Sequence, residues 1–172
     1  MSSVGALPRE LVDALPFCAG DPHRFIDARE FAQFHRYPPA TREQIERVED
    51  RVGFPLPEAL RIIYLEVGNG GFGPGYGILG VDDGATDDLG GNVEQVYENL
   101  SAPDAEVRDW EWREHALPFC YWGCQVYSCV MPDGSVVDLD GYDWGEDHIP
   151  VAEWLSRWAH GQEPRPTREE KT

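Results

Sequence analysis

Three cysteines in the second half of the chain, Cys120, Cys124 and Cys129, carry side chains that can bind a soft metal ion. With His115 they offer the thiolate and imidazole ligands that structural zinc uses. They fall on segments that we expect to be strands, whose side chains alternate between two faces. Cys120 and Cys124 would share a face, whereas Cys129 would point away, so the set does not converge on one tetrahedral site. We therefore predict no metal and no cofactor, and expect the thiols to pack as small apolar side chains.

A second candidate is the dense run of carboxylates over residues 138–147, which supplies the oxygen ligands that calcium prefers. The run lacks the frame of an EF-hand loop, because Gly141 comes too early and no glutamate stands at the closing position. Three interpretations remain: a solvated acidic loop, a patch that binds a partner, and a calcium site. Trp144 lies within the run, and an aromatic side chain rimmed by charges is typical of an interface anchor.

The segment Gly75 to Gly80 matches the G-x-G-x-x-G spacing of dinucleotide-binding loops. Such a loop must follow a strand and open a helix. Here the motif follows an expected helix and opens an expected strand, with no basic residue near it. We interpret it as a backbone turn.

No set of residues makes a positive case for catalysis. The five histidines are scattered along the chain, and no serine stands in a G-x-S-x-G motif. Carboxylates are so abundant that choosing one acid–base pair would be arbitrary. We predict no catalytic residues and no enzymatic activity.

The formal net charge of −18 is concentrated in one part of the chain. Residues 82–147 hold 2 basic and 17 acidic residues, whereas residues 1–81 hold 8 and 11, and residues 148–172 hold 4 and 4. Such a field repels nucleic acid and anionic membrane surfaces, so we expect neither as a partner, and it favours a basic protein. The predicted partner-binding residues are the acidic residues of two loops and the tryptophan between them: Asp82, Asp83, Asp87, Asp88, Asp138, Asp140, Asp143, Trp144, Glu146 and Asp147. The alternative is that this charge only keeps the protein in solution.

Helical periodicity predicts the elements that would position these loops. Apolar residues recur at helical spacing from Leu60 to Val67, after Pro57 and before Gly68, which we expect in the left-handed conformation that ends many helices. A capping box at Thr41–Gln44 opens a preceding helix that Gly53 ends. Further helices are expected over residues 8–15, 27–35, 92–100, 103–115 and 150–160.

Strands are expected over residues 76–81, 117–122, 125–131 and 135–139, all in one sheet. The short links, including the Pro132-Asp133-Gly134 turn, predict an antiparallel meander. The fold class is therefore α+β, a mainly antiparallel sheet with packed helices in a single domain.

The domain is expected to span residues 41–160. Residues 1–40 form a helical cap on it, with a flexible arm as the alternative, and residues 161–172 form a disordered charged tail. The N-terminus has no basic region or long apolar run of a signal peptide, and no segment has the roughly 20 apolar residues needed to cross a bilayer. We expect a cytoplasmic protein with free thiols.

Several short motifs follow one another in a fixed order: I-x-x-V-E (Ile45, Val48, Glu49), L-P-x-x-L (Leu56 to Leu60), I-x-Y (Ile62 to Tyr64), N-G-G (Asn69 to Gly71) and W-G (Trp122, Gly123). Together they resemble the SUKH superfamily, whose members include the yeast cell-wall assembly regulator and many bacterial immunity proteins. The resemblance covers roughly residues 41–160. It implies a SUKH-like α+β fold in which the motif residues Leu56, Pro57, Asn69, Gly70, Gly71, Trp122 and Gly123 are structural.

The resemblance also implies a non-catalytic role in binding a partner protein, often a secreted toxin. The expected function is that of an immunity protein that neutralises its toxin by occlusion. The alternative is an intracellular regulatory scaffold for endogenous proteins.

Overall fold

The structure is a computed structural model that describes residues 7–15, 37–102 and 110–165. Its centre is an antiparallel sheet in which β1 (Leu117–Gly123), β2 (Val126–Val130) and β3 (Ser135–Asp140) are neighbours in that order. Two short strands, β4 (Asp143–Trp144) and β5 (Ile149–Pro150), both pair antiparallel with β3. The predicted meander and the α+β class are confirmed.

Helix α2 (Arg42–Val52) begins and ends as the sequence predicts. The Thr41 hydroxyl accepts a hydrogen bond from the Gln44 N–H at 3.2 Å, and the Gln44 side chain accepts one from the Thr41 N–H at 2.9 Å. Gly53 closes the helix with a φ of 87°, in the left-handed region.

The following helix is α3 (Glu58–Ile62), which continues as the π turn η2 (Ile63–Val67). The prediction for Gly68 is wrong: its φ is 167°, which is extended backbone. The helix ends instead with a π-type (i to i−5) hydrogen bond from the Gly68 N–H to the Ile63 carbonyl, at 3.0 Å. The left-handed residues that reverse the chain are Gly70 and Gly71, with φ of 80° and 85°.

The segment 76–81 is not a full strand of the sheet, in contrast to the prediction. It forms one isolated bridge, Ile78 to Cys120, along the outer edge of β1. Backbone hydrogen bonds join Tyr76 to Tyr121 and Leu79 to Phe119, at 2.9 and 2.8 Å. The ladder stays incomplete because Gly75 and Gly77 have positive φ, which interrupts the extended conformation.

Helix α4 (Val93–Ser101) and helix α5 (Val151–Ala159) agree with the predicted segments. Residues 110–115 are not helical, so that part of the predicted helix over 103–115 is wrong, and residues 103–109 lie outside the described residues. The predicted helix over 27–35 also lies outside them.

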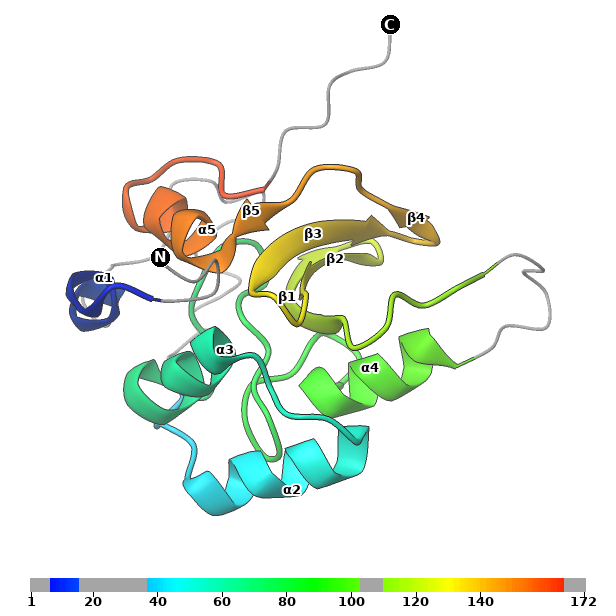
Figure 1. The fold of residues 1–172 in the computed structure, drawn as a ribbon, viewed down its shortest axis with the longest axis horizontal. Coiled ribbons are helices and arrows are strands. Elements are labelled where there is room, and N and C mark those ends of the chain that lie inside the picture. Colours follow the sequence, from blue (N-terminus) through cyan, green and yellow to red (C-terminus); the bar gives the residue numbers. More distant parts are fainter. Residues whose placement is uncertain (1–6, 16–36, 103–109, 166–172) are drawn as a thin grey trace, which may run out of the picture.

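The helices pack around the sheet (Figure 1), and the side chains buried between them form one apolar core. Helix α1 (Arg9–Ala14) packs against α5 and η2, while α2 packs against α4, and α4 against β1. Trp154 of α5 and Phe119 of β1 are fully buried, with ring centroids 5.0 Å apart. Among the described residues, no helix is both long enough and apolar enough to span a membrane.

Candidate binding groove

The first acidic turn, at Asp82 and Asp83, is attached to helix α2. The Asp82 carboxylate accepts a hydrogen bond from Arg47 at 2.8 Å and from the Gln44 amide at 3.2 Å. The hydrogen bond from Arg47 lowers the pKa of Asp82 below its ordinary value. Much of the charge of Asp82 is therefore engaged within the molecule.

The second acidic turn is organised by Asp87, which joins it to the sheet. One carboxylate oxygen accepts the backbone N–H groups of Leu89 and Gly91, at 3.0 and 2.8 Å. The other accepts the Tyr127 hydroxyl of β2 at 3.3 Å. Burial, and then the negative charge of Asp87, raise the pKa of Tyr127, so its hydroxyl stays protonated and donates. The turn holds Leu89 outward with 90% of its surface exposed.

Four large aromatic side chains gather beside the β3–β4 hairpin, and we call them the aromatic cluster: Trp110, Trp112, Tyr142 and Trp144. Trp110 lies edge-on to Tyr142 with centroids 5.0 Å apart and is stacked parallel to Trp144 at 6.3 Å. Trp112 meets Trp144 edge-on at 5.0 Å. The Trp110 indole donates to the Leu100 carbonyl of α4 at 3.0 Å, which ties the cluster to that helix.

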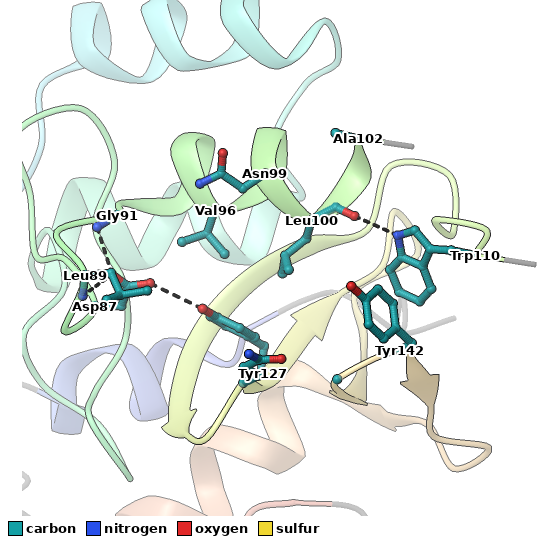
Figure 2. Close-up of a pocket in the computed structure, with 12 residues that line it drawn as sticks. Asp87, Leu89, Gly91, Val96, Asn99, Leu100, Ala102, Trp110, Tyr127 and Tyr142 are labelled. Carbon is teal, nitrogen blue, oxygen red and sulfur yellow. Dashed lines mark hydrogen bonds between the residues drawn. The ribbon is translucent and has the colours of Figure 1, made fainter. Parts of the chain in front are cut away.

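A groove of about 330 Å³ runs between α4, the Asp87 turn and the tip of the β3–β4 hairpin. Figure 2 shows Asp87 and Tyr127 at one end and Trp110 and Tyr142 at the other. Val96 and Leu100 of α4 line it with aliphatic surface. None of the described residues that line the groove is basic.

The groove brings together some of the predicted binding residues. Asp87 lines it, Asp88 follows in the same turn, and Gly141 and Tyr142 line it between Asp140 and Asp143. The two hairpin aspartates are paired across β3 and β4, and both are exposed. Asp82 and Asp83 are held at α2 instead, while Glu146 and Asp147 are exposed between β4 and β5.

Asp138 does not lie on the acidic surface, which corrects its assignment. Its side chain is 8% exposed and accepts a hydrogen bond from the Ser128 hydroxyl at 2.8 Å. The Trp122 indole donates to the same hydroxyl at 2.9 Å. Asp138 thus belongs to a polar chain inside the fold, because nearly all of β3 is buried on both faces.

Trp144, the predicted anchor, is half-buried in the aromatic cluster. The Arg113 guanidinium lies 5.0 Å from its ring centroid, and its indole N–H donates to the Glu111 carbonyl at 3.3 Å. Among the described residues, the exposed large hydrophobic side chains are Leu89 and Tyr142, the latter 50% exposed. Sequence reasoning missed both, although an isolated leucine or tyrosine among aspartates and glycines is a usable signal.

The family motif residues lie at close contacts between segments. Asn69 is 3% exposed, and its side-chain amide donates to the Val81 carbonyl at 2.9 Å and accepts the Val81 N–H at 2.8 Å. A Cβ on Gly70 would lie 2.5 Å from the Ile78 carbonyl oxygen, and one on Gly123 would lie 2.7 Å from the Tyr76 ring. Leu56 is buried and Pro57 caps α3.

The thiols are dispersed. Cys120 and Cys129 are fully buried, and burial raises the pKa of both well above the ordinary value, whereas Cys124 is exposed in the β1–β2 turn. Within the described residues, no three or more histidine, cysteine or carboxylate side chains are grouped so as to hold a metal ion.

The arrangement nearest to a catalytic set joins Ser135, His148 and Asp133. The Ser135 hydroxyl lies 3.2 Å from His148 Nδ1 and 2.7 Å from Asp133 Oδ1. The other ring nitrogen of His148 faces the Arg113 guanidinium at 3.2 Å. Because an arginine can only donate, Nε2 of His148 accepts from Arg113, and Nδ1 carries the proton of the neutral ring. His148 Nδ1–H then donates to the Ser135 hydroxyl, which in turn donates to Asp133. A histidine held this way cannot take a proton from the serine, as a triad requires.

The fold is an α+β domain in which the N-G-G and W-G motifs lie at close contacts between segments. The model of the SMI1 / KNR4 family (SUKH-1) matches residues 39–160, and the chain belongs to this family. Membership of the SUKH superfamily, expected from the ordered motifs, is confirmed. Comparison with curated proteins and with solved structures finds no match.

Proposed function

We propose that this protein neutralises a basic protein partner by covering it, as an immunity protein does, without chemistry of its own. The observation that carries the proposal is the groove beside Asp87. It exposes Leu89 and Tyr142, has no basic residue in the described part of its lining, and is flanked by the exposed carboxylates of Asp140 and Asp143. An exposed apolar contact rimmed by charge of one sign is typical of a protein-binding surface.

Family membership supports the same function. SUKH domains include toxin immunity proteins, commonly bind toxin partners, and are generally non-catalytic. A toxin that acts on nucleic acid needs a basic surface, and an acidic protein that covers this surface would block it. Occlusion needs only fast encounter, which charge supplies, and slow release, which buried apolar contact supplies. A cytoplasmic site of action belongs to the proposal, since the thiols of Cys120, Cys124 and Cys129 are free.

The test is protection of cells. If the gene beside that of this chain encodes a toxin domain, that domain is expressed in a bacterial host, alone and together with the chain. Growth should fail with the toxin alone and return with both, and the purified pair should form a stable complex. The host must stay sensitive when the chain carries Leu89→Asp and Tyr142→Asp together, because these changes place charge in the apolar contact. Full protection by this double variant, or no protection by the parent, would refute the proposal.

The second candidate is a regulatory scaffold that binds endogenous proteins through the same surface. The yeast cell-wall assembly regulator, a member of the superfamily, favours this alternative. The two functions differ in the partner: a neighbouring gene without a toxin domain, and capture of one defined host protein that the Leu89 and Tyr142 variant fails to hold, would favour the scaffold.

A further inference from the structure

The two ends of the groove differ in their chemistry. One end has the Asp87 carboxylate and the Tyr127 hydroxyl, both polar. The other end has the rings of Trp110 and Tyr142. Aliphatic surface of α4 connects them (Figure 2). An occupant that fits these surfaces has an apolar stem that packs on the α4 wall and a planar cation that both the carboxylate and the rings attract.

Asp87 retains capacity for such a cation. A carboxylate can accept about four hydrogen bonds, and the described contacts of Asp87 are three: two backbone N–H groups on one oxygen and the Tyr127 hydroxyl at 3.3 Å on the other. The second oxygen therefore has an acceptor position and the larger share of uncompensated charge. Since none of the described residues that line the groove is basic, none of them supplies a countercharge to Asp87.

The chain itself shows which cation its tryptophan rings accept. The Arg113 guanidinium lies 5.0 Å from the ring centroid of Trp144, and the Arg165 guanidinium lies 4.4 Å from that of Trp122. In both places a planar guanidinium covers a half-buried indole. The Trp110–Tyr142 pair at the end of the groove offers the same kind of surface to a partner.

We propose that the groove receives an arginine side chain of the partner, with its stem along Val96 and Leu100 and its guanidinium between the Asp87 carboxylate and the aromatic end. Arginine is favoured over lysine because its planar guanidinium stacks on rings, presents a fork of donors to a carboxylate, and is less strongly hydrated. This inference rests on the proposed function, which it makes specific: the partner is basic and inserts one arginine here.

The test uses three blocked tripeptides, Ac-Gly-Xaa-Gly-NH₂, in which Xaa is arginine, lysine or citrulline. Citrulline has the planar shape of arginine without its charge. Each is titrated into the ¹⁵N-labelled full chain and followed by NMR at the amides of Gly91 and Gly141 and at the indole N–H of Trp110. We expect saturable shifts at these positions with the arginine peptide, weaker binding of the lysine peptide, and binding of the citrulline peptide roughly tenfold weaker than that of arginine.

Two variants and a matched control locate the site. Asp87→Asn keeps an oxygen for the Leu89 and Gly91 N–H groups but removes the charge, and Tyr142→Leu keeps apolar bulk but removes the ring. Both variants should bind the arginine peptide several-fold more weakly than the parent. Asp83→Asn, which removes the same charge at the turn attached to α2, should leave it unchanged.

Three results would overturn the assignment: equal affinity for arginine and citrulline, equal loss from Asp83→Asn and Asp87→Asn, or shifts that map away from the groove. Failure of this inference is distinguishable from failure of the proposed function. A toxin that is neutralised equally by the parent, Asp87→Asn and Tyr142→Leu would refute the arginine site while retaining neutralisation. A chain that protects against no toxin would refute neutralisation, whatever the peptides do.

Discussion

Asn69 shows how one side chain holds two segments together. It is buried at the end of η2, and its amide makes both hydrogen bonds to the backbone of Val81. The backbone carbonyl of Asn69 accepts the Ala85 N–H at 3.0 Å, which holds the chain between the two acidic turns. The buried amide of Asn69 therefore helps to fix the position of those turns, together with the contacts of Asp82 and Asp83 with α2.

Replacing Asn69 with alanine should destabilise the protein strongly. The substitution leaves the buried Val81 N–H without a hydrogen-bond partner, which costs about 1–3 kcal/mol, while the Val81 carbonyl keeps the Gly84 N–H at 2.9 Å. Urea denaturation should give a loss of about 1–3 kcal/mol in the free energy of unfolding. Asn99→Ala, an exposed position on α4, is the matched control and should change stability by less than about 0.5 kcal/mol. Similar losses from both variants would contradict this role for Asn69.

Glu94 is a buried carboxylate in the first turn of α4. One oxygen accepts the Asp82 N–H at 2.7 Å, while the other is buried and has no hydrogen-bond partner among the described residues. Burial raises its pKa above the ordinary value of 4.5. The charged form is therefore less favourable in the folded chain than in the unfolded chain.

The raised pKa of Glu94 predicts a pH dependence of stability. Above the unfolded pKa the native chain still holds this proton, so the free energy of unfolding falls as pH rises through the folded pKa. The parent should lose more stability than Glu94→Gln when pH is raised from about 4.5 to about 7.5, because glutamine does not titrate. Denaturation curves of both proteins at the two pH values measure the difference. Parallel losses would show that Glu94 does not carry this dependence.

At the residue scale, the sequence predicts which element carries each acidic residue better than it predicts where the side chain points. Asp138 stands in a strand, and strand alternation normally turns one face to solvent. Here both faces of β3 are covered, so the side chain turns inward to Ser128. Trp144 is similarly engaged by Trp110, Trp112 and Arg113, which come from a segment 30 residues earlier whose path the sequence does not reveal.

At the scale of elements, the crossing from η2 to the edge of β1 depends on glycine. The backbone of Gly70 lies so close to Ile78 and Gly80 that a Cβ would be 2.5 Å and 2.7 Å from their atoms. This proximity lets the Gly71 N–H reach the Ile78 carbonyl at 2.9 Å. The N-G-G motif thus forms a tight crossing of two segments in which the position of Gly70 accepts only glycine.

Gly70→Ala and Gly90→Ala separate this steric effect from backbone strain. Both glycines have positive φ, 80° and 83°, so alanine incurs a similar conformational cost of about 1–2 kcal/mol at each. Only Gly70 has backbone atoms where the new methyl group would lie, whereas Gly90 has open space. Thermal denaturation should show a much larger fall in Tm for Gly70→Ala. Equal falls would mean that the crossing can relax.

Elements with local signals were predictable, and those set by distant contacts were not. The capping box of α2, its closing Gly53 and the tight turn of the meander depend only on neighbouring residues. The segment 76–81 has strand-forming residues, yet Gly77 within it and Gly75 just before it adopt positive φ where the chain passes Phe72 and Trp122. Residues 110–115 have a helical pattern, but the contact of Trp110 with α4 and the β3–β4 hairpin holds them in a non-helical path.

At the scale of the whole molecule, the fold keeps acidic charge at separate places. Asp82 and Asp83 lie against α2, and Asp140 and Asp143 lie at the end of the sheet that carries β4 (Figure 1). A partner steered by total charge would approach either region, whereas the groove offers apolar contact only at the second. Charge reversal at matched positions therefore distinguishes directed steering from a general effect of net charge.

Asp140→Lys with Asp143→Lys should slow association with the cognate basic partner, because long-range attraction acts before contact. The control is Glu46→Lys with Asp50→Lys, which changes net charge equally at exposed positions on α2, away from β4 in Figure 1. Stopped-flow binding should show a several-fold lower association rate for the hairpin variant than for the control. The gap should narrow as salt rises, since charges are screened beyond about 8–10 Å at physiological ionic strength. Equal rates for the two charge variants at low salt would place the interface elsewhere.

Trp144→Ala should mainly raise the dissociation rate, because it removes the support of Trp110 beside the groove.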